Sequence, residues 1–171
     1  MSKRVTQAQS GATYRKLPIT TQLKNVLEYA ARQANVYVRV ISGGQTHVPG
    51  GAGKSIKGVR TGSTRHDIRA GQMGAADVTL HDGDGTKLDL RKPADASRMG
   101  IFTEAAVAAG AVGVGAGIGY MGAHTIHIGG GTAATWGAGK GHKIAAFIPG
   151  AHSRGMARFR LGQEARAAQQ V

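Results

Sequence analysis

The chain has 171 residues, of which 41% are hydrophobic, so it can bury the core of one domain. It has no cysteine, which excludes disulfides and leaves only His, Asp or Glu to bind a transition metal. Lys and Arg total 22 against 9 acidic residues, and the resulting net charge of +13 predicts an anionic partner. We expect neither a membrane span nor a secretory signal, because no stretch is long and apolar enough for either.

The predicted elements begin after a basic arm at residues 1–19. Apolar residues at helical spacing predict a helix over 20–35, and the alternating run VYVRVI predicts a strand over 36–41. A long loop rich in glycine should follow, since the chain contains 28 glycines and many fall in turns. A second strand is expected over 75–81.

The second half of the chain also predicts both strands and a helix. KLDL (87–90) is expected to pair with the second strand as a hairpin, and a second helix is predicted over 95–109. Small and apolar residues alternate over 113–131 and predict one or two further strands. The remaining 136–171 form a basic tail, rich in Gly and Ala, that is loose or helical. We therefore predict an α+β fold, a small and mostly antiparallel sheet flanked by helices, with the body of the domain at 20–135.

Two glycine motifs resemble nucleotide-binding sequences without their context. GGAGKS (50–55) lacks the leading glycine of a P-loop, because Val48 stands in its place. The run from Gly117 to Gly122 fits G-x-G-x-x-G, but it occurs late in the chain, outside any βαβ unit. HDGDG (81–85) lacks the ligand spacing of an EF-hand loop and is expected to be a turn.

Asp77 lies in an apolar strand between Ala76 and Val78. A carboxylate in such a place is usually paired, hydrogen-bonded or bound to a metal. A salt bridge to Arg39 or Arg65, or a capping role in a turn, is one interpretation. Metal binding is the other.

Two histidines share the setting of Asp77. His66 and His127 also lie near the ends of predicted strands, beside turns rich in glycine. Two imidazoles and one carboxylate are the ligands of many catalytic zinc sites, in which water fills the fourth position. His127 alone could instead be an ordinary half-buried strand histidine. His81 is excluded from such a site, because four residues along a strand separate it from Asp77 by roughly 13 Å.

The residues STRHD, GAADV and Ile126-His127-Ile128 resemble the signature S-x-H-x-x-G-x-A-x-D and the late histidine of a zinc peptidase family. This is the family of D-Ala-D-Ala carboxypeptidases and L-Ala-D-Glu endopeptidases, which shares its fold with the hedgehog signalling domain and the murein endopeptidases. The resemblance covers roughly residues 20–130 and includes VISGGQ (40–45), which is similar to a strand that borders the family's active site.

Carried over by position, the resemblance implies that His66, Asp77 and His127 bind Zn²⁺. Gln45 stands where the family often has an arginine that holds the substrate or the developing oxyanion. His124 stands in the place of the family's catalytic Glu or Asp. The gap from His66 to Asp77 is four residues longer than in the family pattern, and the serine lies one residue further from the histidine.

The resemblance implies a zinc metallopeptidase, a hydrolase that cleaves peptidoglycan stem peptides in cell wall degradation. In the implied mechanism zinc polarises the peptide carbonyl, His124 moves the proton of the attacking water, and Gln45 steadies the oxyanion. Because no secretory signal is seen, we expect a bacteriophage origin. The protein would be an endolysin, or a peptidase carried in the virion, that acts at the bacterial cell wall or in the periplasm.

Two other functions stay open. A virion protein that keeps the fold without activity would contact other virion proteins, and both the longer gap before Asp77 and the histidine at position 124 favour it. Nucleic-acid binding would account for the charge, but we do not expect it, because the sequence shows neither a recognition helix nor an aromatic platform. Trp136 either lines the substrate groove or anchors the tail.

Overall fold

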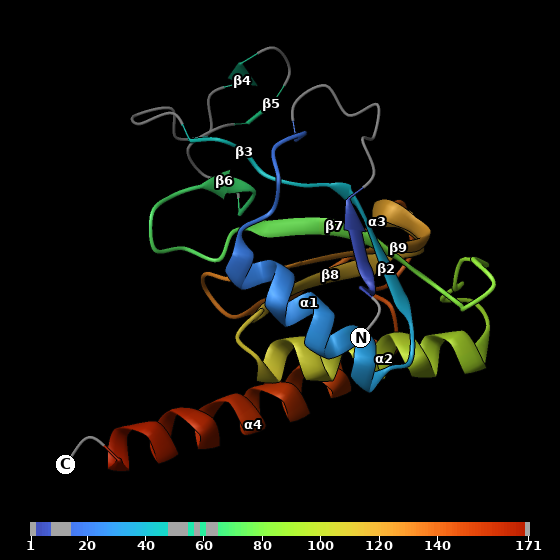
Figure 1. Cartoon of the computed structure of the whole chain (residues 1–171). Helices are drawn as coiled ribbons and strands as arrows, with labels where there is room; N and C mark the ends of the chain where they lie inside the picture. Colours follow the sequence, from blue (N-terminus) through green and yellow to red (C-terminus); the bar gives the residue numbers. More distant parts are fainter. Residues whose placement is uncertain (1–2, 8–14, 48–54, 57–58, 61–64, 170–171) are drawn as a thin grey trace.

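The structure is a computed structural model that describes residues 3–7, 15–47, 55–56, 59–60 and 65–169 (Figure 1). Most of the GGAGKS segment lies outside the described residues, as does the serine of STRHD. None of the helices within the described ranges is both long and apolar enough to cross a membrane.

A mixed sheet of six strands forms the centre of the fold, and the α+β class is confirmed. The strand order is β1 (Val5–Gln7), β2 (Tyr37–Ser42), β7 (Ala75–His81), β9 (Gly122–Gly129), β8 (Gly113–Gly117) and β10 (Ala134–Trp136). The three inner pairings are antiparallel, as expected, whereas the two edge pairings, β1 with β2 and β10 with β8, are parallel.

The main helices are α1 (Thr21–Gln33), α2 (Pro93–Ala108) and α4 (Phe147–Ala168), and a short α3 (Ile118–Met121) joins β8 to β9. Helix α1 begins where predicted, because the Thr20 side chain accepts a hydrogen bond from the Leu23 amide and satisfies one free donor of the first turn. Helix α2 begins at Pro93, whose fixed φ suits a first turn, and is followed by Gly110 with a φ of 106°.

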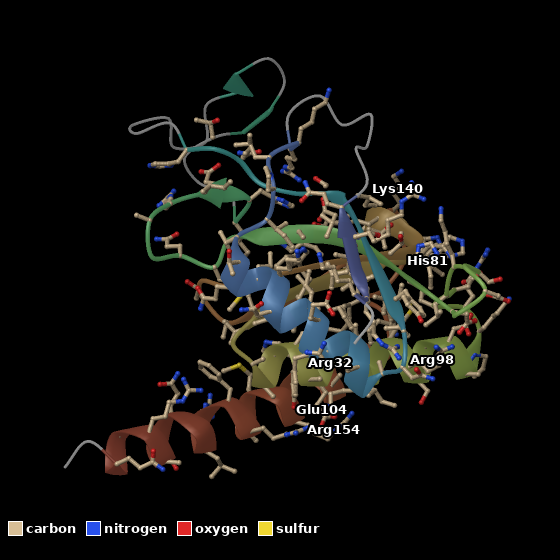
Figure 2. All side chains as sticks on the ribbon, viewed as in Figure 1. Arg32, His81, Arg98, Glu104, Lys140 and Arg154 are labelled. Atoms are coloured by element: carbon tan, nitrogen blue, oxygen red, sulfur yellow. The ribbon has the colours of Figure 1, made fainter. Side chains whose placement is uncertain are left out.

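The helices α1 and α2 lie against one face of the sheet, and α4 packs along α2 and extends beyond its end (Figure 1). Glu104 on α2 accepts a hydrogen bond from Arg154 on α4 at 2.7 Å, and the two side chains lie side by side in Figure 2. The core between sheet and helices is almost entirely aliphatic, and its largest members include Leu23, Leu27, Leu80, Met99, Phe102, Ile126, Ile128 and Ile148.

Both ends of the chain join this unit. Within the expected arm, Val5 belongs to edge strand β1, and the Glu28 carboxylate accepts hydrogen bonds from the Arg4 and Val5 amides. At the start of the expected tail, Trp136 is the last residue of edge strand β10, and further along Ile148 is buried in the core. The sheet and the core therefore continue into the segments expected to lie outside the body of the domain.

The region between β2 and β7 contains short strands rather than loop alone. Strands β3 (Gln45–Thr46) and β6 (Asp67–Ile68) pair in parallel, and β4 (Ser55–Ile56) pairs with β5 (Val59–Arg60) in antiparallel. The expected hairpin at 87–90 is reduced to a bridge between His81 and Lys87, with one hydrogen bond from the Leu88 amide to Leu80. The turn expected at HDGDG is present.

Candidate metal centre

The sheet register places Asp77 directly opposite His127. Asp77 on β7 pairs with His127 on β9, and Gly115 on β8 pairs with His127 from the other side. Side chains alternate along a strand, and their neighbours Val78 and Ile126 point into the core beneath the helices. Asp77 and His127 therefore share the opposite face of the sheet.

His66 reaches this face from the residue before β6. Its carbonyl accepts a hydrogen bond from the Gln45 amide at 2.9 Å, and its Nδ1 lies 2.8 Å from the Gly43 carbonyl oxygen. A carbonyl can only accept, so Nδ1 carries the proton of the neutral ring and Nε2 keeps its lone pair. This lone pair faces Asp77 and His127, and the Gly43 carbonyl orients the ring through the other nitrogen, as hydrogen-bond partners of metal-binding histidines do.

Three ligand-type atoms converge there. The distances are 2.8 Å from His127 Nδ1 to Asp77 Oδ1, 3.2 Å from His66 Nε2 to His127 Nδ1, and 3.5 Å from His66 Nε2 to Asp77 Oδ1. Two ligands of a tetrahedral zinc ion, each about 2.0–2.1 Å from it, lie roughly 3.3 Å apart. The three buried residues can therefore hold a metal ion.

The charges of the site also fit a cation. Two of the converging groups, the Asp77 carboxylate and the His66 Nε2 lone pair, are acceptors, and the single proton on His127 Nδ1 is shared between them. On its far side, the buried His127 Nε2 has no hydrogen-bond partner among the described residues. A divalent cation would match the acceptors better than one proton does.

Asp77 is ionised despite its burial. Burial opposes the charged form, but the hydrogen bond that His127 Nδ1 donates, together with the neighbouring His66 ring, outweighs it and holds the Asp77 pKa well below its usual range. The Arg15 guanidinium also lies 3.5 Å from Asp77 Oδ2. Arg15 is thus the ion-pair partner, instead of the Arg39 or Arg65 considered from the sequence, and it reaches Asp77 from the expected basic arm.

The pKa of His127 is lowered below 6.5, chiefly by burial, which exceeds the opposing hydrogen bond to Asp77. The ring is therefore neutral at pH 7, as a metal ligand must be. Below pH 6.5 the unfolded chain takes up a proton that the folded state excludes. We expect the metal-free protein to lose stability as the pH falls below 6.5, with a slope of up to about 1.4 kcal/mol per pH unit for this one proton.

Urea unfolding of chelated protein at pH 7.0, 6.0 and 5.5 measures this slope. The slope should be smaller in His127→Gln. It should be retained in the control His152→Gln, which replaces a histidine on α4 whose Nε2 donates a hydrogen bond to the Val112 carbonyl. An equal slope in all three proteins would contradict the assignment to His127.

Gln45 is connected to the metal centre through Arg15. Its amide nitrogen donates to Asp67 Oδ1 at 2.6 Å, and its carbonyl oxygen accepts from Arg15 Nε at 3.2 Å. The side chain is almost wholly buried. In the described contacts Gln45 therefore orients Arg15 and Asp67, and its expected contact with a substrate stays a prediction.

The structure does not bring His124 to the metal centre. Its Nδ1 lies 2.8 Å from the Leu88 carbonyl oxygen, and alternation along β9 places it on the face of Ile126, opposite His127. The pairing of β9 with β7 is regular from Thr125 to Gly129, whereas its pairing with β8 shifts register between His127 and Gly122. Within that shifted stretch His124 contacts the Leu88 carbonyl and not a residue of the metal centre. The expected base is therefore on the wrong side of the sheet.

A direct test follows from this placement. We expect His124→Ala to bind zinc with an affinity within about twofold of wild type, because the lost hydrogen bond is remote from the ligands. Isothermal titration calorimetry with a competing chelator measures this. A tenfold weaker affinity would show that His124 supports the site after all.

A pocket of about 300 Å³ lies beside the metal centre, and it is lined by Arg15, Arg65, His66, Tyr120, His127 and Trp136. The Trp136 ring lies 5.0 Å from the ring of His127, and the Arg65 guanidinium lies 5.1 Å from the Trp136 ring. Tyr120 is 42% exposed at the mouth of the pocket. Trp136 is thus part of the pocket wall, and its expected contact with a substrate stays a prediction.

The pocket wall depends on three glycines of β8, of which only Gly117 belongs to the G-x-G-x-x-G run of the sequence. A Cβ on Gly113 would overlap the Arg65 guanidinium, and a Cβ on Gly115 would overlap the Trp136 indole. On Gly117 it would overlap the Gly137 carbonyl. We call Gly113, Gly115 and Gly117 the glycine column. Its signal in the sequence is glycine at every second position of a strand, which leaves one face bare for other groups to pack on.

Comparisons of the chain with protein-family models, with curated proteins and with solved structures found no match.

Proposed function

We propose that the protein is a zinc-dependent peptidase that cleaves peptidoglycan stem peptides. The observation that carries the proposal is the buried triangle of His66, Asp77 and His127, whose ligand-type atoms lie next to a surface pocket. Three protein ligands beside a pocket leave room for a fourth position, as in catalytic zinc sites. The net charge of +13 suits an anionic cell wall, to which it would attract the protein.

In this proposal the residues of the site have separate tasks. Zinc held by the triangle supplies a Lewis acid for the peptide carbonyl. His66 and His127 bind as neutral rings, and Asp77 supplies the negative charge while Arg15 holds its second oxygen. Arg15 and Arg65 line the pocket and favour negative charge that develops there. Tyr120 carries the only hydroxyl among the described residues that line the pocket, and in this proposal it takes the place of His124 in proton transfer.

The proposal is tested by metal analysis together with an assay on purified peptidoglycan. We expect about one zinc per chain, release of new amino groups from the stem peptides, loss of this activity with chelator and recovery on adding zinc. His127→Ala should abolish both zinc binding and cleavage. His152→Ala, which removes a partly buried histidine on α4, should retain both.

A structural virion protein is the second candidate, and the placement of His124 away from the metal centre favours it. It predicts zinc bound at full occupancy without cleavage of any stem peptide. Co-purification of the protein with assembled phage particles would then identify its setting. The bacteriophage origin and the action at the cell wall or in the periplasm are part of the proposal and share this test.

A further inference from the structure

A second and larger cavity, of about 690 Å³, lies next to the metal pocket; we call it the basin. Its lining includes Gln22, Arg65, Arg69, Gln72, Met73 and Thr132, together with several glycines. Arg65 is the residue that lines both the basin and the metal pocket. The two cavities are thus neighbours that share one side chain.

Arg65 forms the ridge between them. On the side of the basin its guanidinium donates hydrogen bonds to the carbonyl oxygens of Gly130 and Thr132. On the side of the metal pocket it lies over the Trp136 ring at 5.1 Å. These contacts fix the position of the guanidinium. A ligand that occupies both cavities at once therefore lies against its positive charge.

The walls of the two cavities are positive, and Arg65 contributes most of this charge, because Arg15 and Arg69 form ion pairs with Asp77 and Asp67 at 3.5 and 3.6 Å. Arg15, Arg65 and Arg69 are among the described residues that line the two cavities, and none of these lining residues is Asp or Glu. Clefts lined by one sign of charge attract ligands of the opposite sign. The amides of Gln22 and Gln72 add groups that can hydrogen-bond a peptide, and Met73 adds an apolar contact.

We propose that the basin is a second subsite, which binds the part of a peptide that continues from the metal pocket across Arg65 and carries a carboxylate. The substrate class is therefore an acidic peptide at least several residues long, rather than a dipeptide held in the metal pocket alone. This inference rests on the proposed peptidase function, because that function places the peptide in the metal pocket from which it continues into the basin. The binding of an acidic peptide is nevertheless measurable without catalysis.

The test changes the charge of the basin at Gln72, which is exposed and makes only a backbone hydrogen bond, to Arg69, among the described contacts. The probe is a fluorescein-labelled pentapeptide with a central Glu, and its isostere with Gln, followed by fluorescence polarisation at low salt on metal-free and zinc-loaded protein. We expect Gln72→Glu to weaken binding of the Glu peptide roughly two- to fivefold and Gln72→Lys to strengthen it by a similar factor. The Gln peptide should respond to neither.

The matched controls are Gln163→Glu and Gln163→Lys, which make the same charge changes at an exposed position on α4. They should leave the affinity for the Glu peptide unchanged. Equal shifts from positions 72 and 163 would show a general effect of net charge and overturn the basin, as would a Glu peptide that binds no better than its isostere.

The failure of this inference is distinguishable from failure of the peptidase. Zinc-dependent release of amino groups from peptidoglycan, with no charge effect at Gln72, overturns the basin and leaves the peptidase. A charge effect at Gln72 in a protein that cleaves nothing supports the basin as a binding site for acidic peptide and removes catalysis.

Discussion

Replacing Asp77 with Asn is expected to weaken zinc binding by more than about 100-fold. Loss of a group that only supports a metal ligand costs 10- to 100-fold, and this change removes the one negative charge of the ligand set. Asn keeps the size and shape of the side chain, so the effect reports charge and coordination. Metal content after dialysis should fall from about one zinc per chain to almost none.

The matched control is Asp89→Asn. Asp89 is buried to the same extent as Asp77, at 6% exposed, and its carboxylate is also ion-paired, with Arg91 at 2.6 Å. This variant should keep its zinc. If both variants lose the metal, the loss reflects damage to the fold; if neither does, the triangle of His66, Asp77 and His127 is not the metal centre.

Replacing Gly115 with Ala is expected to lower the free energy of unfolding by about 1–3 kcal/mol, the cost of forcing an extra carbon into packed structure. The new methyl group would occupy the place of the Trp136 indole, which covers Gly115 and lies 5.0 Å from the His127 ring. Trp136 must therefore move, and the emission of this single tryptophan should change with it. Urea unfolding followed by circular dichroism measures the first effect and fluorescence measures the second.

A second glycine provides a control with the opposite sign. Gly162 lies within α4 and a Cβ there meets no atom within 4 Å. Gly162→Ala should stabilise the protein by about 0.5–1 kcal/mol through helix propensity and leave the fluorescence unchanged. A stable Gly115→Ala variant with unaltered emission would show that the pocket wall does not depend on the glycine column.

The parts of the fold that were predictable are those with local signals. The helix at 20–35 and the strand at 75–81 follow from periodicity within a single segment, and Thr20 supplies an explicit start for the first of them. The opposite parity of His124 and His127 was also readable in the sequence. The resemblance nevertheless placed both residues at one site, whereas the structure places His124 against the Leu88 carbonyl, away from His127.

The rest depends on contacts between distant residues. Arg15 lies 62 positions before Asp77, and nothing near either residue marks the pair. Trp136 lines the pocket because β10 pairs in parallel with β8. Parallel strands are not joined by a tight turn, so no turn motif in the sequence predicts this pairing. The α4 helix carries glycines and a proline that weaken its local signal, and it is held by packing against α2. Tertiary contact overrides propensity in such segments.

The metal triangle has a consequence for the whole chain, because its members are far apart in sequence. His66 and His127 are separated by 61 positions, and a bond through one ion would close a loop of that length. A cross-link over such a loop removes roughly 4 kcal/mol of conformational freedom from the unfolded chain. In a protein without cysteine, the ion would thus take the place of a disulfide. The stability of the protein would depend on the supply of metal, whereas the stability of a disulfide-bonded protein depends on redox conditions.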